Sequence, residues 1–251
     1  MTTILWKEMN KNKILKKFKE IKEMGWVTSK NKDLSGIGST LENLFGIEQN
    51  SLEIPDLINF ELKSHDLNSN FSITLFSATP DGDYLFEVER LKNTYGYPDK
   101  HMKEFKILNF ETATNELNNL GSNFKQTIRV NKQKEIVKLH ILTNDLELID
   151  HEVSWSFKML RDKFERKLRY LALIDAQKKY ENKTIYFKYE NISFYESYSF
   201  DRFIELLEQG IIRIIFKIGV YKKGKKRGKM HNRGVVFTIS RNDLELLFKN
   251  T

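Results

Sequence analysis

Helix and strand patterns alternate along most of this 251-residue chain, and that order constrains its fold more than any other feature. Residues 4–24 carry apolar side chains at helical spacing and are followed by Gly25, which is typical of a helix end. The apolar run "YLALIDA" (170–176) predicts a buried strand, and the helical pattern of 200–209 directly precedes the strand pattern of 211–221. We therefore predict an α/β (α+β) fold built on a mixed sheet.

The same patterns predict the other elements, and a polar stretch marks a boundary between them. They are a short helix at 41–45 capped by Ser39 and Thr40, an antiparallel hairpin of strands 57–65 and 71–78, strands within 127–142, 146–157, 184–196 and 234–239, and a helix at 157–169. Residues 91–124 are rich in turn-forming residues. We therefore predict a single two-lobed domain, with one lobe at 1–90 and the other at 91–251.

The composition excludes several classes of chemistry. The chain has no cysteine, which excludes disulfides, thiol nucleophiles and cysteine-based zinc sites. Hydrophobic residues make up 40% of it, which is enough for a core of useful size. No apolar run approaches the roughly 18 residues of a membrane span, and the first twenty-odd residues are charged where a signal peptide is apolar. We therefore expect a cytoplasmic protein with no membrane partner.

Positive charge is concentrated in residues 209–242, which contain no Asp or Glu. The ten basic residues of this segment are Arg213, Lys217, Lys222, Lys223, Lys225, Lys226, Arg227, Lys229, Arg233 and Arg241. Like charges without compensating acids repel one another unless a partner neutralises them. The segment therefore predicts a surface that binds a polyanion such as a nucleic acid. The alternative is a solvated loop in a lysine-rich sequence.

The segment "IPDLINFELKSHD" (54–66) combines acidic and basic residues with a short apolar strand. Side chains alternate along a strand, so Glu61 and Lys63 share one face, and Asp56 at the preceding bend can bring its carboxylate to Glu61. Two carboxylates and the carbonyl of Leu62 are the oxygen ligands that Mg²⁺ binds, and Mn²⁺ is expected to substitute for it. Lys63 beside such an ion can orient or deprotonate a water molecule and balance the charge of a phosphate.

This spacing is the PD-(D/E)xK pattern of many metal-dependent nucleases. The alternative for Glu61 and Lys63 is a solvated strand face with an ion pair, because short patterns of acids and bases recur by chance. His65 lies on the same face of the strand as Glu61 and Lys63. It is a further candidate for contact with a phosphate or with water at the metal, and the alternative is an exposed histidine without a role.

Four blocks of the sequence, in this order, carry a resemblance to a known family. They are "SGIGSTLENLFGIEQNSLEIPDLINFELKSHD" (35–66), "LKNTYGYPDK" (91–100), "SWSFKMLRDKFERKLRYLALIDAQKK" (154–179) and "KIGVYKKGKKRGKMHNRGVVFTI" (217–239). Together they resemble the MvaI/BcnI family of Type II restriction endonucleases, from about residue 26 to residue 239.

The resemblance implies a restriction-endonuclease-like fold related to the nickase MutH, with a catalytic lobe and a recognition lobe around a DNA cleft. It implies a monomer that cuts double-stranded DNA at a short CC/GG-type site, with a cognate methyltransferase as an expected companion. Asp56, Glu61 and Lys63 match the family's catalytic residues, and Glu42 matches an acidic residue that supports the metal site. His231 matches a histidine near the central base pair of the target.

The sequence departs from the family at the residues that read bases. Family members carry Asp and Arg at the positions of Ile215 and Lys217, and Arg at the position of Thr238. An isoleucine accepts no hydrogen bond from cytosine, and lysine lacks the planar pair of donors that arginine presents to guanine. We therefore expect DNA cleavage with altered reading residues. The alternatives are a MutH-like or structure-specific nickase and a catalytically silent DNA-binding protein.

Overall fold

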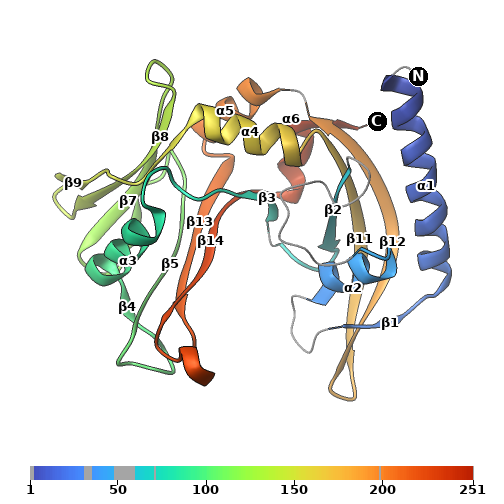
Figure 1. Cartoon of the computed structure of the whole chain (residues 1–251), viewed down its shortest axis with the longest axis horizontal. Helices are drawn as coiled ribbons and strands as arrows, with labels where there is room; N and C mark the ends of the chain where they lie inside the picture. Colours follow the sequence, from blue (N-terminus) through green and yellow to red (C-terminus); the bar gives the residue numbers. More distant parts are fainter. Residues whose placement is uncertain (1–2, 31–35, 48–59, 71, 198, 251) are drawn as a thin grey trace. The chain divides into compact units, whose positions relative to one another are not determined.

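The protein is described by a computed structural model that covers residues 3–30, 36–47, 60–70, 72–197 and 199–250, with side chains from residue 10 onward except at 232, 233, 249 and 250. The described residues form helices and three five-stranded sheets (Figure 1). One of these sheets has both parallel and antiparallel pairs, so the predicted mixed α/β class is confirmed. The chain divides into a first compact unit, Met1–Ile73, Arg166–Tyr198 and Phe248–Thr251, and a second, Thr74–Glu165 and Ser199–Leu247.

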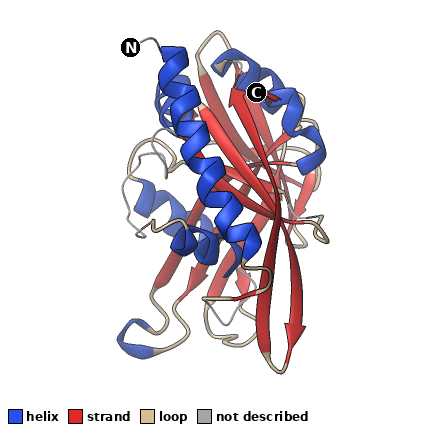
Figure 2. Cartoon of the chain, turned by 90° about the vertical axis from the view of Figure 1, so that its right-hand side faces the viewer, coloured by secondary structure: helices blue, strands red, loops and turns tan. Residues whose placement is uncertain are grey.

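The first unit is built on one sheet with the strand order β1-β12-β11-β2, and β15 pairs with β12. Its elements are α1 (Thr3–Glu23), β1 (Val27–Thr28), α2 (Gly36–Leu44), β2 (Phe60–Asp66), β11 (Tyr170–Glu181), β12 (Thr184–Ser197) and β15 (Phe248–Asn250). The helix α1 lies along this sheet, and the hairpin of β11 and β12 extends beyond the end of α1 (Figures 1 and 2).

The core of the first unit explains why these strands pair as they do. Residues 170–176 of β11 are all buried, which is typical of a strand covered on both faces. β2 lies parallel to it, with Phe60 opposite Tyr170 and Leu62 opposite Ala172. Apolar side chains of α1, including Phe18, pack into the same cluster as Phe60 and Leu62. Burial of this cluster fixes which face of β2 points inward.

The predicted hairpin of strands 57–65 and 71–78 is wrong. The second strand, β3 (Ile73–Ser77), pairs with β14 (Met230–Ile239) in a different sheet, while β2 pairs with β11, more than 100 residues later in the sequence. The hydrophobic pattern identified both strands but not their partners, because an apolar strand can pair with any strand that covers its backbone.

The second unit contains the other two sheets, with strand orders β10-β8-β7-β6 (β9 pairs with β8) and β3-β14-β13-β5-β4. Its strands, in addition to β3, are β4 (Tyr97–Pro98), β5 (Lys106–Thr112), β6 (Asn118–Leu120), β7 (Phe124–Asn131), β8 (Ile136–Thr143), β9 (Leu148–Asp150), β10 (Ser154–Ser156), β13 (Ile212–Val220) and β14 (Met230–Ile239). Its helices are α3 (Tyr84–Tyr95), α4 (Phe157–Lys167), α5 (Phe200–Glu208) and α6 (Leu244–Leu247), and the last two residues of α4 belong to the first unit.

An aromatic core joins the helices and strands of the second unit. Trp155 is fully buried, and its ring lies 5.8 Å from that of Phe237 and 6.0 Å from that of Phe216. Phe203 of α5 lies 5.9 Å from Phe237, and the indole N–H of Trp155 donates to the carbonyl of Ala78 at 3.1 Å. Rings at these separations gain specific packing energy beyond their burial.

Several elements differ from their predicted bounds. α2 begins at Gly36, five residues before the predicted helix, so Ser39 and Thr40 lie inside it instead of capping it. The Ser39 hydroxyl donates to the carbonyl of Gly36, and Thr40 accepts from the backbone N–H of Lys30.

The helix α3 was not predicted, and its last five residues lie in the stretch 91–124 that is rich in turn formers. The division of function between lobes 1–90 and 91–251 stays a prediction.

Candidate active site and nucleic-acid interface

The face of β2 that carries Glu61 and Lys63 is the centre of the candidate active site. Among the described strands, β2 lies at the edge of its sheet, and Glu61 and Lys63 alternate with the core residues Phe60 and Leu62. His65 follows on the same face as Glu61 and Lys63. Glu61 is only 4% exposed, although it is charged. A carboxylate is rarely buried to this extent unless it is paired, so its partners are informative.

Each carboxylate oxygen of Glu61 lies near an ammonium group. Lys63 Nζ is 2.6 Å from Oε1, and Lys167 Nζ is 3.4 Å from Oε2. The sequence analysis did not single out Lys167, which lies 106 residues from Glu61 within the helix predicted at 157–169. The only sequence signal was its position in the last turn of a helix that leads directly into a buried strand. The expected solvated strand face does not describe Glu61, because this ion pair is largely removed from water.

Of the two other predicted metal-site residues, Glu42 and Asp56, the structure describes Glu42. Glu42 lies half-buried on α2, next to the core residue Leu41, and α2 packs against β2 near Ser64. Asp56 lies outside the described residues, so its expected approach to Glu61 stays a prediction. Within the described part of the chain, no three histidine or acidic side chains form a metal-binding group.

His65 faces Asp175 of the neighbouring strand β11. The two residues lie opposite each other in the parallel register, with His65 Nδ1 3.5 Å from Asp175 Oδ1. Both side chains are 11% exposed, so His65 is not the exposed histidine of the alternative interpretation. Neither ring nitrogen has a hydrogen bond to a described residue, although a buried polar atom normally has one.

The basic segment forms the hairpin of β13 and β14, in the second unit. The expectation that its charges have no acidic partners is wrong for three of them. Lys222 lies 3.3 Å from Asp99, and Arg227 lies 2.7 Å from Glu104. Arg213 pairs with Glu111 of β5 and with Glu116, which follows that strand. These acids are distant in sequence, so a count within the segment could not find them.

Asp99 has a structural role in this pairing. It is buried and accepts hydrogen bonds from the backbone N–H groups of His101 and Met102. The bond from His101, followed by the interaction with Lys222, lowers the pKa of the Asp99 carboxyl group. The acid therefore fixes the base of the hairpin loop.

The other basic side chains of the loop point to solvent. Lys223, Lys225 and Lys229 are exposed and form no ion pair within the described part of the chain. Lys226 lies over the ring of Tyr221 at 5.4 Å, and the side chain of Arg233 lies outside those described. The basic residues of this loop thus divide into Lys222 and Arg227, whose ion pairs hold the loop, and lysines without an ion pair to a described residue, which are available to a polyanion.

His231 stacks on Tyr221 across the base of the loop. Their ring centroids are 4.2 Å apart and the ring planes differ by 12°. Tyr221 also closes the loop, because its backbone N–H donates to Lys229 and its carbonyl accepts from Gly228. The position of the His231 ring is therefore set by a backbone-anchored neighbour.

The residues that replace the family's base-reading positions lie on β13 and β14. Ile215 and Lys217 are half-buried on the same face of β13. Thr238 is 1% exposed, with its hydroxyl 3.5 Å from the carbonyl of Arg213. A side chain buried to this degree contacts no base edge in this conformation.

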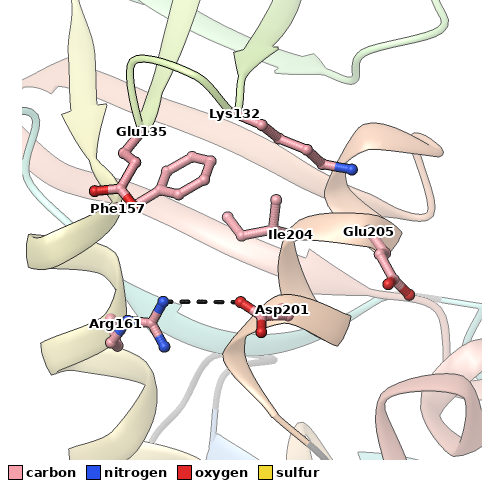
Figure 3. A pocket seen from close by; sticks show the side chains of 7 residues that line it. All are labelled: Lys132, Glu135, Phe157, Arg161, Asp201, Ile204 and Glu205. Carbon is pink, nitrogen blue, oxygen red and sulfur yellow. Dashed lines mark ion pairs between the residues drawn. The ribbon is translucent and has the colours of Figure 1, made fainter.

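A separate cavity in the second unit has a volume of about 310 Å³ (Figure 3). It is lined by Lys132, Glu135, Phe157, Arg161, Asp201, Ile204 and Glu205. Arg161 of α4 and Asp201 of α5 point toward each other, 3.7 Å apart, and Lys132 pairs with Glu208 at 2.6 Å. None of the predicted site residues lines this cavity, so the candidate active site is not part of it.

Comparisons with known proteins relate this arrangement to one family. The model of the MvaI/BcnI restriction endonuclease family matches residues 15–248. The chain is similar to a structure titled "Restriction endonuclease MvaI-cognate DNA substrate complex", with 29% identity, a TM-score of 0.90 and coverage of 100% of this chain and 98% of that one. It is also similar to "Restriction endonuclease MvaI in the absence of DNA", with 28% identity, a TM-score of 0.62 and the same coverage. A comparison with curated protein sequences gave no match. No described helix is long and apolar enough to cross a membrane.

Proposed function

The chain belongs to the MvaI/BcnI restriction endonuclease family, as its sequence blocks predicted, and on this premise we propose that it is a Mg²⁺-dependent endonuclease that cuts double-stranded DNA at a specific sequence. The observation that carries the proposal is the buried Glu61 carboxylate, held beside Lys63 on one face of an edge strand. The cognate DNA in the structure of MvaI supports DNA as the partner.

The proposed metal ligands are the carboxylates of Asp56 and Glu61 and the carbonyl of Leu62, with Glu42 supporting the site from α2. These residues fit a hard divalent ion, because Glu61 provides a buried oxygen donor at a sheet edge and Glu42 lies on a helix packed against the same strand. Mg²⁺, or Mn²⁺ in its place, would neutralise phosphate charge and make water a better nucleophile at neutral pH.

Lys63 is the proposed partner of the attacking water. Its ammonium is fixed by the 2.6 Å contact with Glu61 and is 23% exposed, so it remains accessible to a water molecule or a phosphate oxygen. Water adds across a P–O bond of the DNA backbone, and one product carries the phosphate while the other carries the hydroxyl group. His65 is a second candidate for phosphate contact on this face.

The β13–β14 hairpin is the proposed DNA-docking element. Exposed Lys223, Lys225 and Lys229 bind backbone phosphates, which position the protein without reading sequence. The other residues that we propose for DNA docking are Lys217, Lys222, Lys226, Arg227, His231 and Arg233. His231 lies near the central base pair of the target by analogy with the family. The target is a short CC/GG-type site, altered because Ile215 and Thr238 offer no equivalent donors or acceptors.

The proposed enzyme acts as a monomer, with two lobes around the DNA, and has a cognate methyltransferase that protects the same site. A nickase that uses the same residues differs from it in a simple way. On supercoiled DNA a nickase yields open circles only, whereas a restriction enzyme proceeds to linear DNA.

Cleavage of supercoiled and linear DNA of known sequence tests the proposal. The wild type, Asp56→Ala and Glu61→Gln are incubated with Mg²⁺ or with EDTA, and the fragment ends are sequenced. Glu181→Gln, at the exposed tip of the β11–β12 hairpin, is the matched control. Discrete Mg²⁺-dependent fragments from the wild type and the control, but not from the other two variants, support the proposal. DNA binding without cleavage by the wild type would contradict it.

A further inference from the structure

Two lysines from distant parts of the sequence hold the carboxylate of Glu61. One buried carboxylate lies between two ammonium groups, Lys63 at 2.6 Å and Lys167 at 3.4 Å. The two lysine side chains are 23% and 20% exposed, so both are partly shielded from water.

The fold places Lys167 at this position. It is the last residue of α4, and only Leu168 and Arg169 separate it from β11, whose first residue Tyr170 lies opposite Phe60 at the start of β2. The parallel pairing of β11 with β2 thus brings the end of α4 to the beginning of β2. A cation is also favoured at a helix C-terminus, where the backbone carbonyl groups carry partial negative charge.

Lys167 is the weaker of the two partners of Glu61. Its Nζ–O distance is 0.8 Å longer than that of Lys63, so Oε2 is the oxygen more readily given up. A divalent cation that takes Oε2 as a ligand has to replace this ammonium or stay close to it, and like charges at such distances repel strongly in a partly buried site. A phosphate oxygen, by contrast, is an anionic partner to which the ammonium can turn.

We propose that Lys167 is a positioning residue that holds Oε2 of Glu61 until a DNA phosphate arrives, and then pairs with that phosphate and leaves Oε2 to the divalent cation. This inference rests on the proposed nuclease function. Its consequence is coupling: DNA strengthens metal binding, and by thermodynamic linkage the metal strengthens DNA binding by the same factor. In the absence of DNA, Lys167 keeps the metal affinity low.

Binding of Mn²⁺ to the protein without DNA tests the competition directly, by electron paramagnetic resonance of free Mn²⁺ at pH 7.5. Lys167→Met removes the charge and keeps the apolar stem, and it is expected to lower the Mn²⁺ dissociation constant at least about fivefold. Lys167→Arg keeps the charge and should bind Mn²⁺ like the wild type. Lys158→Met, exposed on the same helix, is the control and should change nothing.

The coupling is tested by fluorescence anisotropy of a labelled DNA duplex, with and without Ca²⁺ as the probe ion. Ca²⁺ should strengthen duplex binding by the wild type more than by Lys167→Met. Lys167→Gln provides the same comparison if the methionine variant does not fold. Unchanged or weaker Mn²⁺ binding by both neutral variants would overturn the inference.

The outcomes separate this inference from the proposed function. If the wild type cuts DNA and the neutral variants bind Mn²⁺ no more tightly, only the role of Lys167 fails. If the wild type cuts no DNA but the neutral variants bind Mn²⁺ more tightly, the nuclease proposal fails and the competition at Glu61 stands.

Discussion

Gly228, in the loop of the basic hairpin, is predicted to tolerate no side chain, and Gly224 of the same loop is the control. The φ angle of Gly228 is +78°, and a Cβ added to it would overlap the ring of Phe105, with Cε1 at 2.5 Å. Gly224 has a similar φ of +73°, but a Cβ added there meets no atom within 4 Å. The pair therefore separates the cost of backbone strain from the cost of the clash.

The expected magnitudes follow from these two terms. An alanine in the left-handed region costs about 1–2 kcal/mol, and this applies to Gly224→Ala and to Gly228→Ala alike. Overpacking against a ring costs a further ~1–3 kcal/mol, and this applies to Gly228→Ala only. Phe105 is half-buried beside Arg227, at 5.5 Å, so its ring cannot move without disturbing the contacts that hold the loop.

Urea unfolding measures this difference. Trp155 is fully buried in the same unit as the loop, so its fluorescence reports the unfolding of that unit once Trp6 and Trp26 are replaced by Phe. Gly228→Ala should lower the free energy of unfolding clearly more than Gly224→Ala does. Equal losses for the two variants would refute the reasoning, because they would show that Phe105 does not restrict the loop.

Three other predictions follow from particular contacts. Lys225→Ala should weaken DNA binding and reduce the slope of log affinity against log salt concentration by about 1, because Lys225 is exposed and free to contact a phosphate. A slope equal to that of the wild type would show that Lys225 contacts no phosphate. Tyr221→Ala should weaken discrimination at the central base pair more than overall affinity, because it removes the ring stacked on His231; competition between duplexes that differ at that pair measures it. Asp150→Asn should destabilise the second unit by about 2–3 kcal/mol at pH 7, since the partly buried Arg90 loses the carboxylate of Asp150 and keeps that of Glu87. Burial alone raises the pKa of Asp150, but hydrogen bonds, first that from Arg90, bring the pKa below its usual value. The stabilisation by the Asp150 carboxylate is therefore present above about pH 4 and is lost as the pH falls through the lowered pKa. Urea unfolding at pH 7 and pH 3 should show that the free energies of unfolding of the variant and the wild type converge at the lower pH.

Much of the secondary structure and the central residues of the candidate site followed from the sequence. The apolar spacing of residues 4–24 predicted α1, and the alternation around Leu62 placed Glu61 and Lys63 on one face of a strand. Both predictions depend on the fixed periods of helices and strands, which relate residues only a few positions apart. The acid-free run of basic residues was visible for the same reason.

Only the tertiary structure decided which distant residues complete these local patterns. β2 pairs with β11 and not with β3, and this parallel pairing brings Lys167 to Glu61. In the second unit, Asp99 and Glu104 neutralise two charges of the hairpin loop from a different part of the chain. Such contacts depend on which buried faces meet when the core forms, and no residue spacing encodes the partner. The sequence therefore determined the elements and the residues on each face, and the packing of those faces determined the environment of the charges.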